Sequence, residues 1–361
     1  DDIDLDSLVE LTIPELLHNL DPHSAYIPAS ARTVANRDLE GSFFGIGIQF
    51  QMINDTLYVL EVIHGAAAEE AGLLPGDRIV EVDGMNIAGN GKTSDDVFNL
   101  LRGPKDTQVQ VKVKRHSSPP PLVFDLTRGE VPVSPVDAAY MINDSIGYLR
   151  LGKFSENTYM ESLSTLAQLR YDGARAFVID LRGNTGGYMS PAVMLANEFL
   201  GPKQLIVYTK GRNVSDNNIL FADGSGTFTD EKVVILVDEY TASSSEIFSG
   251  AIQDNDRGLI VGRRTFGKGL VQSPFELPDS SEFRLTVQRY YTPSGRCIQK
   301  TYSPGHGLEY ETEIYSRYDR GELFSLDSIR LDSTQIFSTA HDRRVYGGGG
   351  IMPDIFVPSD T

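Results

Sequence analysis

A serine cluster at the start of a predicted helix is the first group of residues whose types could do chemistry. The segment TASSSE at 241–246 follows an apolar run that predicts a buried strand. A turn at that place can present the Ser243 hydroxyl at a helix N-terminus, where free amides favour developing negative charge. The alternative is a serine that only caps the helix.

A lysine between two glycines is the second group. Lys268 lies between Gly267 and Gly269, which indicates tight backbone rather than a solvated helix. A serine hydroxyl needs a base, and a lysine can serve only when burial has lowered its pKa from about 10.4. Ser–Lys pairs are a known alternative to the histidine-based triad. A surface or phosphate-contacting lysine is the other interpretation, although the glycine spacing of a phosphate loop is missing.

The segment DLRGNTGG at 180–187 is the third group, and it joins a predicted buried strand to a predicted helix. Its glycines allow backbone amides to approach a substrate closely, as the donors of an oxyanion hole must. A plain turn or a dinucleotide loop is the alternative, but the full G-x-G-x-x-G pattern is absent.

Composition narrows the classes of function. The formal net charge of −18 argues against a nucleic-acid binder, which normally shows a basic face. The one cysteine, Cys297, cannot form an internal disulfide, and no Cys/His cluster has zinc spacing, so we expect neither metal nor cofactor. No run of 18 apolar residues is present. The chain begins at Asp1 without Met, which we take as a trimmed start that leaves a removed signal peptide open.

The elements that would position these groups fall into three parts. Residues 1–40 have a rough helical spacing of leucines and predict an N-terminal helical segment. Residues 41–128 predict a small α+β domain of short strands with two helices. Residues 129–361 alternate strands with helices and predict an α/β core with a wound sheet, in which 300–346 is an insertion of unknown role.

Together the three segments resemble the carboxy-terminal processing (tail-specific) protease family. Two further motifs are similar to that family, LDPHS at 20–24 and GIMPD at 350–354, so the likeness covers nearly the whole chain except 300–346. The resemblance implies a serine peptidase with a crotonase-like or Clp-protease-like core.

The resemblance also implies roles for single residues. Ser243 would be the nucleophile, Lys268 the general base, and Gln272 the neutral amide that orients the lysine without raising its pKa as a carboxylate would. The backbone amides of Gly186 and Ser244 would form the oxyanion hole. The neighbouring hydroxyls of Ser244 and Ser245 are rivals for the nucleophile, but the spacing of 25 residues to the lysine favours Ser243.

The unit 41–128 resembles a PDZ domain, a module that binds protein tails by strand addition. The four residues matching its carboxylate-binding loop are Phe44, Gly45, Ile46 and Gly47. Arg102 would couple occupancy of this domain to the protease core; a surface arginine after a helix is the alternative.

These observations predict a serine endopeptidase that cleaves near protein C-termini, with exposed tails as substrates. An activating adaptor and a homo-oligomer stay open as partners, and the family resemblance predicts the periplasm or cell envelope. Two alternatives belong to other classes: a catalytically silent scaffold that binds tails, and a nucleotide-binding α/β enzyme.

Overall fold

A computed structural model describes residues 5–360, apart from the side chains at 5–11, 33–34, 37–39 and 119; residues 1–4 and 361 lie outside it. The chain forms two compact units, one from residues up to 40 together with 134–361, and one from 41–133. The second unit ends beyond the predicted 128 because β9 (Gly129–Pro132) pairs with β2 (Ser42–Gly45). We call the first the protease unit and the second the PDZ-like unit.

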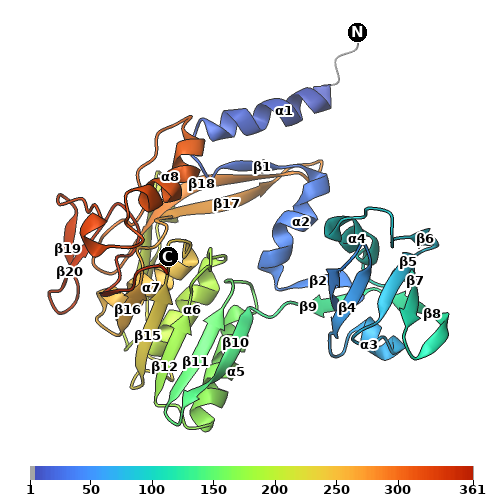
Figure 1. The fold of residues 1–361 in the computed structure, drawn as a ribbon. Coiled ribbons are helices and arrows are strands. Elements are labelled where there is room, and N and C mark those ends of the chain that lie inside the picture. The colour runs from blue at the N-terminus through green and yellow to red at the C-terminus, as the bar shows by residue number, and fades with distance from the viewer. Residues whose placement is uncertain (1–4, 361) are drawn as a thin grey trace. The chain divides into compact units, whose positions relative to one another are not determined.

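A six-stranded sheet is the centre of the protease unit (Figure 1). Its first two strands are antiparallel and the others are parallel, as alternating strands and helices predict. In order across the sheet the strands are β10 (Val136–Asn143), β11 (Ile146–Leu151), β12 (Ala176–Asp180), β15 (Lys232–Val237), β16 (Leu259–Gly262) and β21 (Ile355–Phe356). The helices that belong with it are α5 (Thr158–Tyr171), α6 (Met189–Phe199) and α7 (Ser244–Asp254). One hydrophobic core unites this sheet with its helices.

A second sheet completes the protease unit. It contains β1 (Ala25–Ile27), β13 (Leu205–Gly211), β14 (Ile219–Phe221), β17 (Leu270–Glu276) and β18 (Glu282–Tyr291). Strand β1 lies between α1 (Leu5–His18) and α2 (Ala29–Glu40) and pairs with β18. The N-terminal segment, predicted as a separate helical part, therefore contributes a strand to the protease unit.

The PDZ-like unit has its own sheet and its own hydrophobic core. The sheet runs β3 (Ile48–Met52), β4 (Leu57–Val62), β5 (Arg78–Val82), β7 (Gln108–Arg115) and β8 (Ser118–Thr127), with β6 (Met85–Asn86) beside β5. Its helices are α3 (Ala67–Ala71) and α4 (Ser94–Leu101). Thr93 caps α4 through a reciprocal capping box with Asp96, as a threonine at that place predicts.

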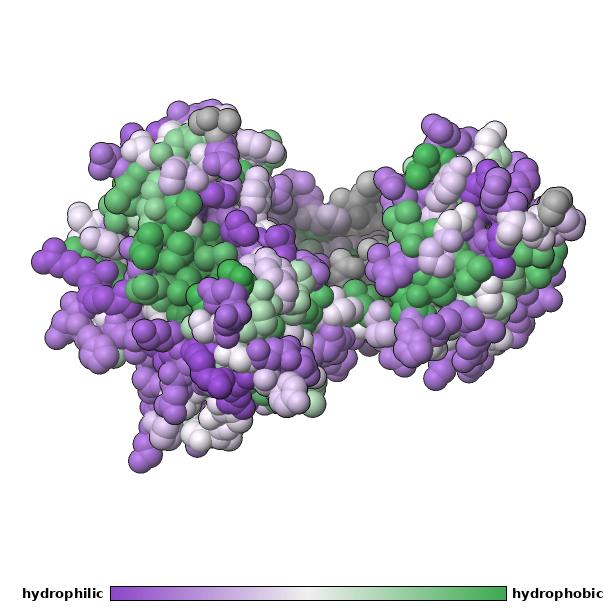
Figure 2. Space-filling model, turned by 60° about the horizontal axis from the view of Figure 1, so that its bottom comes forward, coloured by the Kyte–Doolittle hydropathy of each residue, from purple (hydrophilic) through white to green (hydrophobic). Residues whose placement is uncertain are grey.

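Residues 300–346 form α8 (Gly307–Asp319) and the hairpin of β19 (Ile336–Ser338) with β20 (Arg344–Tyr346). Of the described helices, none is long and apolar enough to cross a bilayer. On the face drawn in Figure 2, hydrophilic residues cover much of each unit, and each unit also shows hydrophobic patches.

Candidate active site

Ser243 lies in the turn between β15 and α7, at the N-cap position of the helix. Its φ of 55° and ψ of −116° place a non-glycine residue in a strained part of backbone space. Such strain persists only where the surroundings impose it, and it is typical of sharp strand-to-helix turns that expose a nucleophile. The structure therefore has Ser243 at a helix N-terminus, as predicted.

The two neighbouring serines have their hydroxyls committed elsewhere. Ser244 Oγ donates to the Gly187 carbonyl at 2.8 Å, and Ser245 Oγ donates to the Asn184 carbonyl at 3.1 Å. Both residues are 1% exposed or less. Their contacts fasten the 184–187 loop to the start of α7. Ser243 and Ser244 both line the cavity, but only the Ser244 hydroxyl already has an acceptor among the described residues.

Lys268 lies in the loop between β16 and β17, and the glycines beside it allow close backbone packing. Gly267 has a φ of 90°, and a Cβ added to Gly269 would lie 2.9 Å from the Gln299 nitrogen. Burial lowers the pKa of the Lys268 amine, while the negative charges of Glu246 and Asp21 act in the opposite direction. The lowered pKa makes the neutral amine more accessible near neutral pH than it is for an exposed lysine.

Gln272 holds the lysine amine and is itself held by the N-terminal segment. Lys268 Nζ donates to Gln272 Oε1 at 3.0 Å, and Gln272 Nε2 donates to the His23 carbonyl. Asp21 in turn fixes that segment, since its carboxylate accepts the amides of His23 and Ser24 at 2.8 and 2.9 Å. The LDPHS motif thus orients the amide that contacts the proposed base.

His23 does not take part as an acid or a base. Burial, and next the charge of Lys268, lower its pKa to about 3, and its Nε2 contacts the Tyr310 hydroxyl at 2.9 Å. The neutral ring therefore adds no charge beside Lys268.

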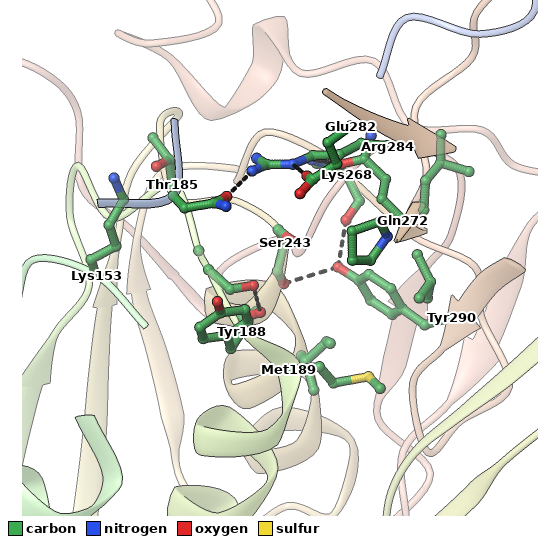
Figure 3. A pocket seen from close by; sticks show the side chains of 18 residues that line it. Lys153, Thr185, Tyr188, Met189, Ser243, Lys268, Gln272, Glu282, Arg284 and Tyr290 are labelled. Carbon is green, nitrogen blue, oxygen red and sulfur yellow. Dashed lines mark hydrogen bonds and ion pairs between the residues drawn. The ribbon is translucent and has the colours of Figure 1, made fainter. Parts of the chain in front are cut away.

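Ser243, Lys268 and Gln272 line one cavity of about 410 Å³ in the protease unit. Figure 3 shows Thr185 and Tyr188 on one side, Lys268, Gln272 and Tyr290 on the other, and Ser243 between them. Within the described part of the chain, no hydrogen bond joins Lys268 Nζ to the Ser243 hydroxyl. The amine donates to Gln272 instead.

The two predicted oxyanion donors differ in this conformation. The Ser244 amide, at the N-terminus of α7, meets no acceptor among the described residues. The Gly186 amide donates to Asn184 Oδ1 at 2.9 Å, so it is already engaged. Gly186 lies against the nucleophile's turn, because an added Cβ would be 2.7 Å from the Ser243 Cβ and 2.9 Å from the Ser244 nitrogen.

Sequence reasoning missed two residues of this site, Glu246 and Tyr290. Glu246 was noted only as part of the serine motif, and its carboxylate accepts the amides of both Ser243 and Lys268 at 2.9 Å. Tyr290, on β18, lines the cavity and places its hydroxyl 3.0 Å from the Ser243 carbonyl and 2.6 Å from the Lys268 carbonyl. A glutamate three residues after the serine is a weak indication of a site residue, and the sequence around Tyr290 gives no such indication.

In the PDZ-like unit, the predicted carboxylate-binding loop joins β2 to β3. Gly47 has a φ of 79°, and a Cβ there would lie 2.1 Å from the Ala66 Cβ, so only glycine fits. The amides of Ile46 and Gly47 find no acceptor in the described chain. The Arg102 guanidinium lies over the rings of Phe43 and Phe98, at 4.0 and 4.7 Å from their centroids. A pocket of about 10 Å³ beside this loop is lined by Phe43, Gly45, Ile46, Gly47, Ile48, Phe50, Phe98, Leu101 and Arg102.

No group of three or more His, Cys, Asp or Glu side chains within the described residues could hold a metal ion. The protein groups that the site offers are a hydroxyl, a desolvated amine, an amide that orients it, and backbone donors. Such a set fits acyl transfer.

Comparison with known proteins identifies the families that both units resemble. Residues 145–313 match peptidase family S41 and residues 58–115 match the PDZ domain. The carboxy-terminal-processing protease of Bartonella bacilliformis is 36% identical over 298 residues, which are 81% of this chain and 67% of the relative. The carboxyl-terminal-processing protease of a Synechocystis species is 39% identical over 267 residues, 72% of this chain and 61% of the relative.

Among solved structures, the photosystem II D1 C-terminal processing protease is similar with a TM-score of 0.50 and 27% identity, covering 99% of this chain and 84% of that one. The chain spans roughly two thirds of the length of the Bartonella and Synechocystis relatives. The predicted fold class, a protease core with a PDZ domain, is confirmed. The chain belongs to peptidase family S41, a serine-type family whose relatives here are carboxy-terminal-processing proteases.

Proposed function

We propose that the chain is a serine endopeptidase that cleaves near protein C-termini, with Ser243 as nucleophile and Lys268 as general base. The observation that carries the proposal is the shared cavity: Ser243 and a lysine whose pKa burial lowers both line it, together with Gln272. The PDZ-like unit would bind the substrate's tail through the loop that contains Ile46 and Gly47, with the coupling role of Arg102 kept as part of the proposal.

The mechanism follows from these positions. The neutral Lys268 amine takes the Ser243 proton as the hydroxyl attacks the scissile carbonyl, and the ammonium then protonates the leaving amine. The Ser244 amide would donate to the oxyanion. The Gly186 amide can join it only after leaving Asn184, since it donates to that side chain at 2.9 Å.

The base must also move. Lys268 Nζ donates to Gln272 in the present conformer, so a change in its side-chain torsions has to bring it to the Ser243 oxygen. Catalytic hydrogen bonds often form only once substrate is bound. The same observation gives some support to the second candidate, a scaffold that binds tails without cutting them.

A serine-reactive fluorophosphonate probe and a tailed, unfolded protein substrate separate the two candidates. We expect labelling and cleavage by the parent chain, and loss of both in Ser243→Ala, with Lys268→Ala nearly as inactive because the pair acts as a unit. Cleavage that persists in Ser243→Ala contradicts the assignment of the nucleophile. Binding of a C-terminal peptide without labelling or cleavage favours the scaffold.

Mass spectrometry of the products from candidate envelope proteins, compared with Ser243→Ala, would identify the natural substrate. An adaptor, a homo-oligomer and an envelope or periplasmic location remain part of the proposal. The location rests on the family resemblance alone.

A further inference from the structure

The proposed nucleophile and base come from different junctions of the fold. Ser243 follows β15, and Lys268 follows β16 in a glycine-containing loop. Their side chains share no hydrogen bond within the described chain, yet their peptide units are joined through two buried side chains. One of these, Glu246, receives the amides, and the other, Tyr290, faces the carbonyls.

Glu246 is fully buried, and its carboxylate connects two segments of the site. Oε2 accepts the amides of Ser243 and Lys268, both at 2.9 Å. Oε1 accepts the Thr265 hydroxyl at 2.5 Å and the Gly267 amide at 2.8 Å. One carboxylate thus takes four hydrogen bonds, three of them from the loop that carries the base.

Tyr290 contacts the same two residues on their carbonyl side, whereas Glu246 accepts their amides. It is 1% exposed, and its hydroxyl lies 2.6 Å from the Lys268 carbonyl and 3.0 Å from the Ser243 carbonyl. A phenol has one proton, so the two carbonyls share a single donor. Burial raises the pKa of Tyr290 far above its ordinary value, which keeps that donor in place at any working pH.

We propose that Glu246 and Tyr290 are positioning residues that together hold the backbones of Ser243 and Lys268 in one fixed relation. The inference rests on the proposed function, in which the Ser243 hydroxyl gives its proton to the Lys268 amine. Because the attacking oxygen and its base must meet within hydrogen-bond reach, a displacement of about 1 Å can cost on the order of 10²-fold in rate. Neither positioning residue needs to touch the substrate's reacting atoms.

Glu246 also acts on the base through its charge. The negative carboxylate raises the pKa of Lys268 against the effect of burial; Asp21 acts in the same direction and Arg284 in the opposite one. Lys300 is a further titratable group that senses Glu246. Burial raises the pKa of Glu246 itself to about 7, although its four donors oppose that shift. Removing this charge should therefore change the basicity of Lys268, which a purely structural residue would not do.

Tyr290→Phe tests the carbonyl half, because it removes only the shared donor. We expect kcat for a fluorogenic peptide to fall about tenfold or more with KM within about twofold, since catalytic groups rather than substrate are displaced. Tyr159→Phe is the matched control: its hydroxyl donates to Glu198 at 2.8 Å, outside the cavity, and its kcat should stay within about twofold of the parent.

Glu246→Gln tests the amide half. The amide oxygen can still accept from Ser243 and Lys268 and the amide nitrogen can donate to the Thr265 hydroxyl, whereas the Gly267 amide loses its acceptor. The melting temperature, measured beside activity, shows whether the fold persists without the charge. We expect kcat to fall. We also expect the rise of kcat/KM with pH to have its midpoint at a lower pH than in the parent, because losing a neighbouring anion lowers the pKa of Lys268.

The outcomes separate the two levels of inference. Suppose that Ser243→Ala is inactive, that the kcat of Tyr290→Phe stays within twofold of the parent, and that the pH midpoint of kcat/KM in Glu246→Gln is unchanged. This result overturns the positioning pair and leaves the proposed function standing. Cleavage retained in Ser243→Ala overturns the proposed function and the pair with it. A tenfold loss in Tyr290→Phe at unchanged melting temperature, together with the downward shift in Glu246→Gln, supports the pair.

Discussion

One buried amine carries the proposed chemistry, so its immediate partner determines at which pH the site works. Gln272 contacts Lys268 Nζ at 3.0 Å with a neutral oxygen. A neutral partner orients the amine without stabilising the ammonium as a carboxylate would. Since Lys268 must be neutral to act as a base, activity should rise as pH rises through its pKa, which burial has lowered.

Gln272→Glu should shift that rise to higher pH. A carboxylate on Nζ favours the charged amine and raises the pKa of Lys268, so we expect the midpoint of kcat/KM to move up by about 1–2 pH units. The pH–rate profile of peptide cleavage measures this. Gln272→Ala is the control, since it removes the contact without adding charge and should lower kcat with no upward shift. Equal midpoints in all three proteins would show that Gln272 does not act on the base.

The sequence predicted the residues whose roles depend on type and spacing. It missed those whose roles depend on which distant segments of the chain pack together. Ser243, Lys268 and Gln272 were proposed from motifs, and all three line one cavity. Tyr290 could not be proposed, because nothing in the strand 282–291 indicates which carbonyls its hydroxyl will meet. The engagement of the Gly186 amide by Asn184 was equally invisible, since it depends on a loop conformation rather than on a motif.

At the scale of elements, α8 explains what the segment 300–346 does for the site. Arg317 on α8 is fully buried and donates to the carbonyls of Arg264, Thr265 and Phe266, just before the base. Glu313, one turn earlier, pairs with its guanidinium at 2.9 Å. The segment predicted as an insertion of unknown role therefore fastens the loop that carries Lys268.

Arg317→Met should destabilise the protein and slow the reaction. The substitution keeps an apolar stem but leaves three carbonyls without this donor, and Glu313 keeps Lys300 at 3.4 Å as its nearest remaining cation. Breaking a buried ion pair costs about 3–5 kcal/mol. Urea unfolding measures the first effect and peptide cleavage the second. Arg320→Ala on the end of the same helix is the control, because its side chain is 33% exposed and its carboxylate contacts are no closer than 3.8 Å. Equal stability of the two variants would contradict the role of Arg317.

The wound sheet was predictable because its strands are continuous apolar runs, such as 233–237 and 176–179, separated by amphipathic helices. The second sheet was not. Strand β18 alternates polar and apolar residues over 282–288, as a half-buried strand does, but β17 contains Pro274 and lacks that alternation. Neither segment indicates which strands it will pair with. Long-range pairing, including that of β1 with β18, decides those elements.

At the scale of the whole molecule, the division into two units separates recognition from chemistry. Residues 41–133 have a complete core of their own, so this unit should fold when expressed alone. The site with Ser243 and Lys268 lies wholly in the other unit. Tail binding and bond cleavage are then two properties that substitutions can remove one at a time.

The unit 41–133 alone should therefore distinguish a free carboxyl terminus from a blocked one. Free amides at Ile46 and Gly47 fit an anion, and apolar side chains such as Ile48 and Leu101 line the small pocket beside them. We expect a labelled peptide ending in Ala-Ala-Val to lose about tenfold or more in affinity when its carboxylate is amidated, because charge-assisted hydrogen bonds are lost. Fluorescence anisotropy measures both forms. Full-length Ser243→Ala should bind the acid form with the same preference over the amide, whereas equal affinity for acid and amide in both proteins would show that this loop does not read the carboxylate.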